Sequence, residues 1–311
     1  MLKNPVLVIA GPTASGKSAL AAEAAHALNG VVLNCDSMQI YKDIPIIAAA
    51  PTEAEKKLAE HRLFEIYDCN KRGNVVDWLN LCAAEIHKLW AENRLPVVVG
   101  GTGFYAEALL NGVTPIPETP PEIRRQLQER LGKFGLAELY AELQQKDAEI
   151  AAKLNPNDKT RIIRALEVMA ATGSKLSEWY KKPLIQKLPE AHFMTVKIMP
   201  ELEVIAERCC LRLDKMVNEL GVLSEIERLL TRGVDENMPA MKALGVPELS
   251  LFIKGQATLE EALALAKLHT RQYAKRQRTW LKNKMSADVV FENVYTGQKD
   301  YLQQIFKAIN L

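Results

Sequence analysis

A phosphate-binding loop stands near the start of the chain. Residues 11–18 read GPTASGKS and fit the pattern G-x-x-x-x-G-K-[ST], between an apolar run at 6–10 and an alanine-rich stretch at 17–28. In such a loop, glycine lets backbone N–H groups surround phosphate oxygens, and the start of the following helix adds partial positive charge. Lys17 adds a full charge, and the hydroxyl of Ser18 is a ligand for Mg²⁺. The expected phosphate contacts are Gly11, Pro12, Thr13, Ala14, Ser15, Gly16, Lys17 and Ser18.

An acidic residue and a glycine-rich turn follow the next two strand-like runs. Asp36 comes after the run at 31–33, and a carboxylate at the carboxyl end of a parallel strand points into the crevice beside the loop. Three roles are open to it: a Mg²⁺ ligand, a general base, or a cap of the turn. The segment 100–103, GGTG, follows the run at 96–99; its glycines permit close approach of a ligand, with Thr102 facing the same crevice. A tight turn without a ligand is the alternative.

Two groups of cations occur on predicted helices of the C-terminal half. Arg208 and Arg212 are four residues apart, so they share a helix face with Lys215, although Glu219 continues the same stripe as on a solvated face. A second group lies within one narrow wedge of a later helix, with Ala266, Tyr273 and Trp280 roughly opposite as the expected core side. Its members are Lys267, Arg271, Lys275, Arg278 and Lys282. No acid interrupts this wedge, which favours contact with a phosphate backbone over a plain solvated face.

The elements that must position these residues alternate between strand and helix. Apolar runs at 6–10, 31–33 and 96–99 are separated by helical patterns, which predicts a parallel sheet with right-handed crossovers. Four prolines within 115–121 then open a region of three helical stretches, 122–131, 136–145 and 159–171. A strand at 193–198, a helix-rich stretch with a basic helix at 265–282, and a short strand at 288–294 complete the chain.

We therefore predict an α/β fold with a P-loop parallel-sheet core, a helical insertion domain and a helix-rich C-terminal part. The core comprises residues 1–114 and 191–311, and the insertion comprises residues 115–190.

Composition excludes several classes of protein. The chain has 311 residues, 48% of them hydrophobic, and a net charge of +2, which excludes disordered, collagenous and uniformly basic proteins. Its five cysteines form no C-x-x-C pair, so a disulfide framework or a paired-cysteine zinc site is not expected, and reduced thiols point to the cytoplasm. No apolar stretch is long enough for a transmembrane helix or a signal peptide. We expect a cytoplasmic protein, a monomer, with no membrane partner.

The motifs together closely resemble those of the tRNA dimethylallyltransferases, also called tRNA isopentenyltransferases. The matching segments are GPTASGKS, DSMQ with Tyr41 two residues further on, GGTGFY, NDKTRIIRALEVMAATG at 157–173, ERCCLRLDKMV at 207–217 and TRQYAKRQRTW at 270–280. They span nearly the whole chain. The resemblance implies transfer of a dimethylallyl group from dimethylallyl diphosphate to N6 of adenosine 37, beside the anticodon of tRNA. The products would be N6-isopentenyladenosine and diphosphate.

The resemblance also implies roles for particular residues. The loop would hold the diphosphate of the donor, Asp36 would take a proton from the adenine amine, and Thr102 would hydrogen-bond the same base. Lys17, Arg208, Arg212 and Mg²⁺ would stabilise the leaving diphosphate. The adenine would leave its stack to reach the pocket. Expected contacts with the tRNA anticodon stem-loop are Asp36, Ser37, Met38, Gln39, Thr102, Arg124, Lys159, Thr160, Arg161, Arg164, Lys242, Gly245, Arg271, Lys275, Arg276 and Arg278.

Two segments depart from the family pattern. Where the family commonly has D-I-G-T-A-K-P, this chain has 43–51, DIPIIAAAP, without the lysine. At 245–248 it has GVPE in place of G-Y-[KR]-E, so an aromatic and a cation are missing there. Two other functions remain open: a small-molecule P-loop kinase that uses ATP, and a non-catalytic RNA-binding protein with a degenerate nucleotide site. Loss of prenyl transfer on mutation of Asp36, with tRNA binding retained, would separate them.

Overall fold

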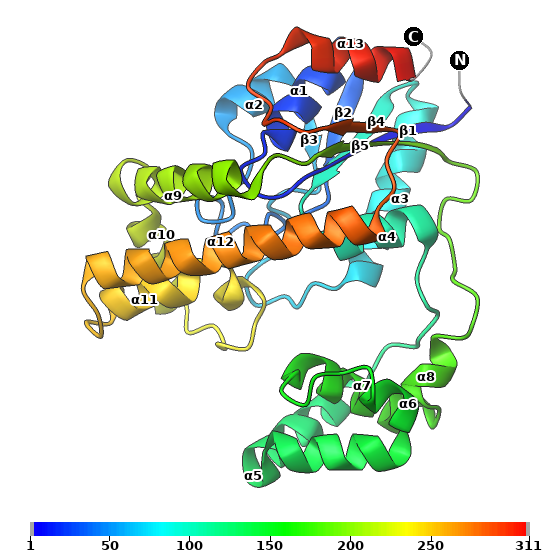
Figure 1. Cartoon of the computed structure of the whole chain (residues 1–311), viewed down its shortest axis with the longest axis vertical. Helices are drawn as coiled ribbons and strands as arrows, with labels where there is room; N and C mark the ends of the chain where they lie inside the picture. The colour runs from blue at the N-terminus through cyan, green and yellow to red at the C-terminus, as the bar shows by residue number, and fades with distance from the viewer. Residues whose placement is uncertain (1–2, 309–311) are drawn as a thin grey trace. The chain divides into compact units, whose positions relative to one another are not determined.

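A parallel sheet forms the centre of the larger part of the chain. The computed structural model describes residues 3–308, and within them six strands pair in parallel in the order β3-β2-β4-β1-β5-β6 (Figure 1). The strands are β1 (Pro5–Ala10), β2 (Gly30–Asn34), β3 (His61–Arg62), β4 (Leu95–Gly100), β5 (His192–Ile198) and β6 (Val289–Phe291). This sheet confirms the predicted α/β class. The two-residue edge strand β3 was not predicted, because two residues carry no recognisable alternation.

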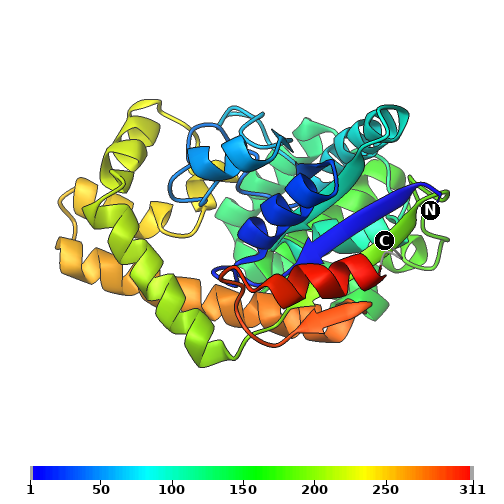
Figure 2. The ribbon, with the colours of Figure 1, turned by 90° about the horizontal axis from the view of Figure 1, so that it is seen from above.

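Helices cover both faces of the sheet. Figures 1 and 2 show α1 (Lys17–Ala27) and α13 (Lys299–Ala308) side by side on one face, while α3 (Val75–Ala91) and α4 (Gly103–Asn111) lie on the other. The alanines of α1 allow close approach to β2 and β4, because small side chains bring a helix backbone near the sheet. On the other face Trp78 is fully buried, stacks on Tyr105, and donates its indole N–H to the Asn34 carbonyl at 2.7 Å.

The chain divides into two compact units, residues 3–110 with 187–308 and residues 111–186. The second unit is helical and consists of α5 (Pro121–Lys146), α6 (Ala148–Ala151), α7 (Lys159–Thr172) and α8 (Leu176–Trp179). Helix α5 is kinked at Gly135, whose φ of 78° is open to glycine, so the two stretches predicted at 122–131 and 136–145 run into each other. The unit has its own apolar core, and its entering and leaving segments pair antiparallel at Val113 and Ile185.

The first unit contains further helices and one 3-10 turn. They are α2 (Glu53–Leu58), α9 (Leu202–Asn218), α10 (Val222–Thr231), the 3-10 turn at Ala240–Lys242, α11 (Val246–Ile253) and α12 (Leu259–Lys284). Helix α12 packs against α9 and α11 (Figure 1). No helix among residues 3–308 is long and apolar enough to cross a membrane.

The buried face of α12 differs from the predicted one. Tyr273 and Trp280, which were expected on the core side, are only half-buried. The buried residues are Ala262, Ala266, Thr270, Ala274, Gln277 and Leu281. Most of these side chains are small, and two helices approach most closely where small side chains face each other. The core side of α12 is therefore set by its small residues rather than by its aromatic ones.

Candidate active site

The phosphate-binding loop joins β1 to α1 at the carboxyl edge of the sheet. Its conformation requires glycine at position 16, because φ is 87° there and a Cβ atom would lie 2.2 Å from the Tyr295 carbonyl oxygen. The Ser15 carbonyl accepts a hydrogen bond from the Tyr295 N–H at 3.0 Å. The hydroxyl of Ser15 is buried and has no hydrogen-bond partner in the part of the chain that the structure describes. The loop is thus held in place from the C-terminal segment.

Both arginines of α9 reach the loop. Arg208 Nε donates to the Ala14 carbonyl at 2.9 Å, and Arg212 donates to the hydroxyl of Thr13. The Nε atom of Arg212 is buried and has no hydrogen-bond partner among residues 3–308, and burial lowers the pKa of this guanidinium. Lys17 Nζ lies 3.3 Å from the Pro12 carbonyl. Three cations therefore converge on one loop, with donors left open for an anion.

The environment of Lys17 predicts that binding of the donor depends on pH. Burial, with the charge of Arg212 adding to it and Asp36 opposing it, lowers the pKa of Lys17 to about 8. Only protonated Lys17 attracts a diphosphate, and the bound anion raises its pKa again. The Kd of dimethylallyl diphosphate, whose phosphates are already ionised at this pH, should therefore rise up to about tenfold per pH unit above about 8.

Isothermal titration calorimetry between pH 7 and 9.5, in two buffers of different ionisation enthalpy, measures this Kd and the proton uptake. In Lys17→Met the pH dependence should disappear. A Kd for the wild-type protein that does not change over this range would contradict the prediction.

Asp36 and Thr102 come together where β2 and β4 end. The Asp36 N–H donates to Asn34 Oδ1 at 2.7 Å, and Asp36 Oδ1 accepts from the Met38 N–H at 2.9 Å. In the described part of the chain, no protein hydrogen bond reaches Asp36 Oδ2. Thr102 Oγ1 accepts from the Ser37 N–H at 3.0 Å and lies 3.3 Å from Ser37 Oγ. One carboxylate oxygen is fixed by its turn, and the other is open to a substrate.

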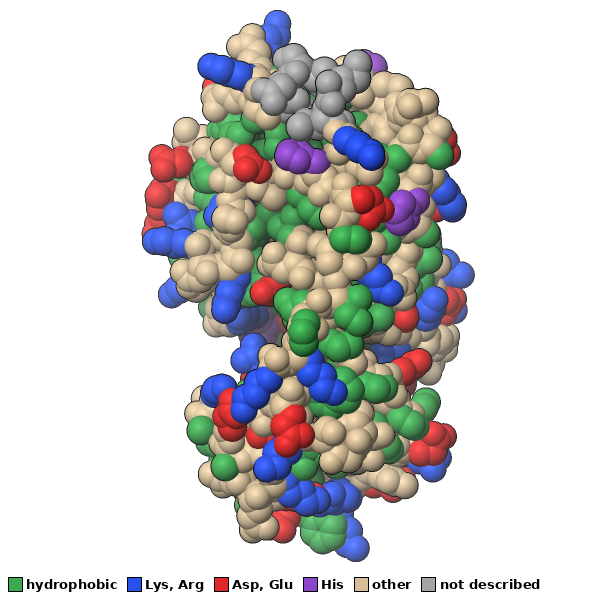
Figure 3. All heavy atoms as spheres, turned by 90° about the vertical axis from the view of Figure 1, so that its right-hand side faces the viewer, with side chains coloured by type: hydrophobic (Ala, Val, Ile, Leu, Met, Phe, Trp, Pro, Cys, Tyr) green, Lys and Arg blue, Asp and Glu red, His purple; other side chains and the backbone are tan. Residues whose placement is uncertain are grey.

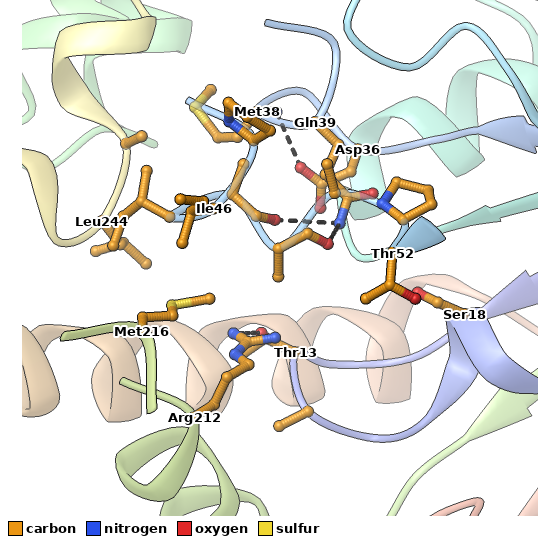
Figure 4. A pocket seen from close by; sticks show the side chains of 18 of the residues that line it. Thr13, Ser18, Asp36, Met38, Gln39, Ile46, Thr52, Arg212, Met216 and Leu244 are labelled. Atoms are coloured by element: carbon orange, nitrogen blue, oxygen red, sulfur yellow. Dashed lines mark hydrogen bonds between the residues drawn. The ribbon is translucent and has the colours of Figure 1, made fainter. Parts of the chain in front are cut away.

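A cavity of about 890 Å³ joins Asp36 to the phosphate-binding loop, and Thr102 lies behind Ser37 without lining it. Thr13, Lys17, Ser18, Asp36 and the two arginines line its polar part. Figure 4 shows Ile46, Met216 and Leu244 together at one end, and Ser18 and Thr52 at the other. A cavity with an apolar end beside a cationic loop suits a molecule that joins a hydrocarbon group to a diphosphate.

The altered segment 43–51 forms one wall of this cavity. The Ile46 and Ile47 N–H groups donate to the two carboxylate oxygens of Glu225, at 2.7 and 2.9 Å. Gln39 Nε2 donates to the carbonyls of Ala48 and Ala49, at 3.1 and 2.7 Å. Gln39, an expected tRNA contact, therefore uses its amide N–H groups to fix the segment 43–51.

Glu225 was not predicted as a site residue. Burial raises the pKa of its carboxyl group, and the side chain is 2% exposed. The sequence does contain an indication of it, because Glu225 is an acidic residue on the apolar face of α10, among Val222, Ile226 and Leu229.

The glycine turn after β4 packs closely against protein, and the approach of a ligand to this turn stays a prediction. A Cβ atom at Gly100 would lie 1.9 Å from the Cys35 carbonyl oxygen, and at Gly103 it would lie 2.2 Å from the Trp280 ring. At Gly101 it would lie 2.5 Å from Gln277 Nε2. The glycines are needed because β2 and α12 approach the turn closely.

Other expected tRNA contacts of the first unit lie on α12 and before α11. Arg271, Lys275 and Arg276 are exposed on α12. Lys242 lines the cavity. The Gly245 N–H donates to Glu248 at 2.8 Å, and this carboxylate also lies 2.5 Å from His269 Nδ1.

The cationic wedge of α12 has acidic neighbours, contrary to the expectation. Lys267 Nζ lies 2.6 Å from Asp214, and Arg278 lies 3.7 Å from Glu201 and donates to the Pro200 carbonyl at 2.9 Å. The acids belong to α9 and the residue before it, so the spacing of residues on α12 alone could not reveal them. Arg271, Lys275 and Lys282 remain exposed on the wedge.

In the second unit, two of the expected tRNA contacts hold a buried acid. Arg124 makes a bidentate pair with Glu167, at 2.7 and 3.1 Å, and Arg164 lies 3.4 Å from the same carboxylate. The first residues of α7, Lys159, Thr160 and Arg161, are exposed. On the face seen in Figure 3, Lys and Arg side chains alternate with Asp and Glu. The exposed cations at the start of α7 are therefore the better candidates for phosphate contact in this unit.

A cluster of two carboxylates and a cysteine lies outside the cavity and has the residue types of a metal site. Asp43, Asp68 and Cys69 lie close together, but Arg232 pairs with both carboxylates. Lys42 adds a further pair to Asp68 at 3.3 Å. The negative charge of this cluster is already balanced by protein cations, so it is a structural ion-pair network.

The fold and the site together are those of a P-loop α/β transferase. The model of the IPP transferase family matches residues 39–284, and the chain belongs to this family. It is 42% identical to the tRNA dimethylallyltransferase of Zymomonas mobilis, over 90% of this chain and 88% of that one. It is 40% identical to that of Rhodospirillum rubrum, over 94% and 90%.

Solved structures agree with this assignment. A tRNA isopentenylpyrophosphate transferase from Staphylococcus epidermidis matches with a TM-score of 0.70 at 30% identity, covering 99% of both chains. A eukaryotic dimethylallyltransferase described as acting on tRNA matches with a TM-score of 0.81 at 28% identity, covering 99% of this chain and 79% of that one. The resemblance drawn from the motifs, and with it the predicted class of enzyme, is confirmed.

Proposed function

We propose that this protein transfers a dimethylallyl group from dimethylallyl diphosphate to N6 of adenosine 37 in tRNA, releasing diphosphate. The observation that carries the proposal is the shared cavity: the open carboxylate oxygen of Asp36 and the cationic loop face the same space. A phosphate loop alone would also suit an ATP-dependent kinase. However, β4, the strand beside β1, ends at Gly100 and is followed by Gly101 instead of a metal-binding carboxylate.

In this reaction the bond between the allylic carbon and the diphosphate oxygen breaks, and a bond forms from that carbon to the adenine nitrogen. The electron pair of the broken bond stays on the diphosphate, where Lys17, Arg208 and Arg212 stabilise the added charge. Asp36 accepts the proton that the amine loses, and Thr102 orients the base. General-base assistance of this kind is worth about 10²–10⁴-fold.

Mg²⁺ fits the same loop. The Ser18 hydroxyl lines the cavity and, within the described residues, forms no hydrogen bond to protein (Figure 4). One hydroxyl together with diphosphate oxygens and water is a hard-oxygen ligand set of the kind Mg²⁺ prefers. We therefore assign Ser18 as its protein ligand. When bound, the ion would offset the charge of the leaving diphosphate.

The acceptor under this proposal is the anticodon stem-loop, with adenosine 37 turned out of its stack into the cavity. Exposed cations at the start of α7 and on α12 would contact its phosphates. Because the substrate is tRNA, we place the reaction in the cytoplasm. All catalytic groups come from one chain, and we propose that it acts as a monomer.

A transfer assay tests the proposal. Purified protein is incubated with Mg²⁺, radiolabelled dimethylallyl diphosphate and unmodified tRNA whose anticodon is followed by adenosines. Label should enter the RNA, and nuclease digestion should release it as N6-isopentenyladenosine. A tRNA with guanosine at position 37 is the matched control and should stay unlabelled. ATP hydrolysis or phosphorylation of a small molecule, without labelled RNA, would overturn the proposal in favour of a kinase.

Removal of the second unit should separate tRNA binding from donor binding. Because the chain enters and leaves this unit through the paired residues Val113 and Ile185, a short Gly-Ser linker can replace 114–184. The loop and its arginines lie in the first unit, so the Kd of dimethylallyl diphosphate should stay within about threefold of wild type. Loss of the exposed cations should weaken tRNA binding by about 10² or more in a filter-binding assay. Unchanged tRNA affinity would rule out the second unit as an RNA-binding part.

A further inference from the structure

A buried glutamine of α12 joins the two halves of the catalytic site. Gln277 Oε1 accepts from the Thr13 N–H at 2.9 Å, and Gln277 Nε2 donates to the Gly101 carbonyl at 2.8 Å. Thr13 belongs to the phosphate-binding loop, and Gly101 immediately precedes Thr102. The side chain is 6% exposed. One planar amide therefore links the loop proposed to hold the diphosphate to the turn that carries Thr102, the residue proposed to orient the acceptor base.

Packing alone does not account for a glutamine at this position. Its neighbours along the buried row of α12, Ala274 and Leu281, are apolar, and a methionine would fill nearly the same volume as Gln277. A buried amide is costly unless both its donor and its acceptor are satisfied. Here each end meets one backbone group of the opposite polarity, so the amide is satisfied in one orientation only.

The contact between Gln277 and the turn is also too close to admit a side chain at Gly101. A Cβ atom at Gly101 would lie 2.5 Å from Gln277 Nε2, so even an alanine at this position would push the amide away. Gly103 makes an equally close contact with Trp280 on the same helix. Helix α12 thus contacts the turn through two residues, Gln277 and Trp280, which are three positions apart. Gln277 also connects the turn to the phosphate-binding loop, because it bonds Thr13.

We propose that Gln277 is a positioning residue that sets the separation between the diphosphate loop and the Gly101–Thr102 turn. The inference rests on the proposed prenyl transfer, because that reaction needs the adenine nitrogen close to and in line with the carbon–oxygen bond that breaks. A misplacement of about 1 Å between reacting groups can cost about 10²-fold in rate. Gln277 also lines the cavity, and in this account it acts through its hydrogen bonds to Thr13 and Gly101.

The first test compares Gln277→Met with Gln272→Met. Gln272 is exposed on the same helix and matches the change in chemistry. In single-turnover transfer with both substrates saturating, Gln277→Met should be about 10²-fold slower than wild type, and Gln272→Met unchanged. The Kd values of dimethylallyl diphosphate and of tRNA should stay within about threefold of wild type in both variants. The proposal would be overturned if Gln277→Met transferred at the wild-type rate. It would also be overturned if the affinities for dimethylallyl diphosphate and for tRNA both fell as much as the rate.

The second test uses the close contact at Gly101. Gly101→Ala should slow transfer in the wild-type background because its methyl group displaces the amide. In a Gln277→Ala background that clash is removed, so Gly101→Ala should cause little further loss. Effects that simply multiply would contradict a shared positioning contact. If wild-type protein transfers no prenyl group, the proposed function fails; if it does and these variants behave normally, only the role of Gln277 fails.

Discussion

Asp36→Asn is expected to reduce the rate of prenyl transfer by about 10²–10⁴-fold while leaving the fold and both binding equilibria intact. An asparagine keeps the oxygen that accepts the Met38 N–H at 2.9 Å, so the turn after β2 survives. It cannot accept the proton of the adenine amine. Single-turnover incorporation of labelled dimethylallyl groups into tRNA measures the rate, and filter binding measures the affinity for tRNA.

Asp300→Asn is the matched control, since this aspartate is exposed on α13 and lies outside the cavity. It should transfer at the wild-type rate. An Asp36→Asn variant with a rate within threefold of wild type would show that another group removes the proton. A parallel loss of tRNA affinity would instead make Asp36 a binding residue.

Arg212→Met should produce the second large effect: it should lower the rate of prenyl transfer and raise the free energy of unfolding of the donor-free protein. The guanidinium donates a hydrogen bond to Thr13, and its buried Nε atom has no partner among the described residues, which leaves a donor for an anion. Loss of one such donor to a developing negative charge typically costs about 10²–10³-fold in rate. Without donor, removal of a charge held partly out of water should raise the free energy of unfolding by about 1 kcal/mol.

Steady-state kinetics measures the transfer rate, and urea unfolding with and without dimethylallyl diphosphate measures the free energy of unfolding. Arg228→Met, at an exposed position of α10, provides the control and should change neither quantity appreciably. The donor should stabilise wild type more than Arg212→Met, because at a given donor concentration the stabilisation grows with the logarithm of the affinity for the folded state. Lower stability of Arg212→Met without donor would mean that this arginine serves the fold.

Local features of the site were predictable because they depend on neighbouring residues. The loop at 11–18 is a contiguous motif between a strand and a helix, and backbone N–H groups of one segment form it. Prolines at 115–121 and 183–189 marked the region that the structure separates as residues 111–186. The i, i+4 spacing placed Arg208 and Arg212 on one face, and both meet the loop.

The partners of these residues were decided by the tertiary structure. Periodicity shows which side chains share a helix face, but it does not show what that face meets. For that reason the pairs of Arg124 with Glu167 and of Lys267 with Asp214 could not be found from the sequence, whereas the i, i+3 spacing of Arg164 and Glu167 does indicate that pair. The same holds for the glycine turn, whose open space proved to be occupied by Cys35, Gln277 and Trp280.

The sequence by itself determined the chemistry available to this protein: a phosphate loop, a carboxylate at the end of a strand, and a supply of cations. The tertiary structure decided which of these groups cooperate. The contact between Thr13 and Gln277 joins residues 264 positions apart, and that between Thr13 and Arg212 joins residues 199 apart. Such contacts arise only when the sheet and the long helix have packed, because closing so long a stretch of chain must be offset by burial throughout the core.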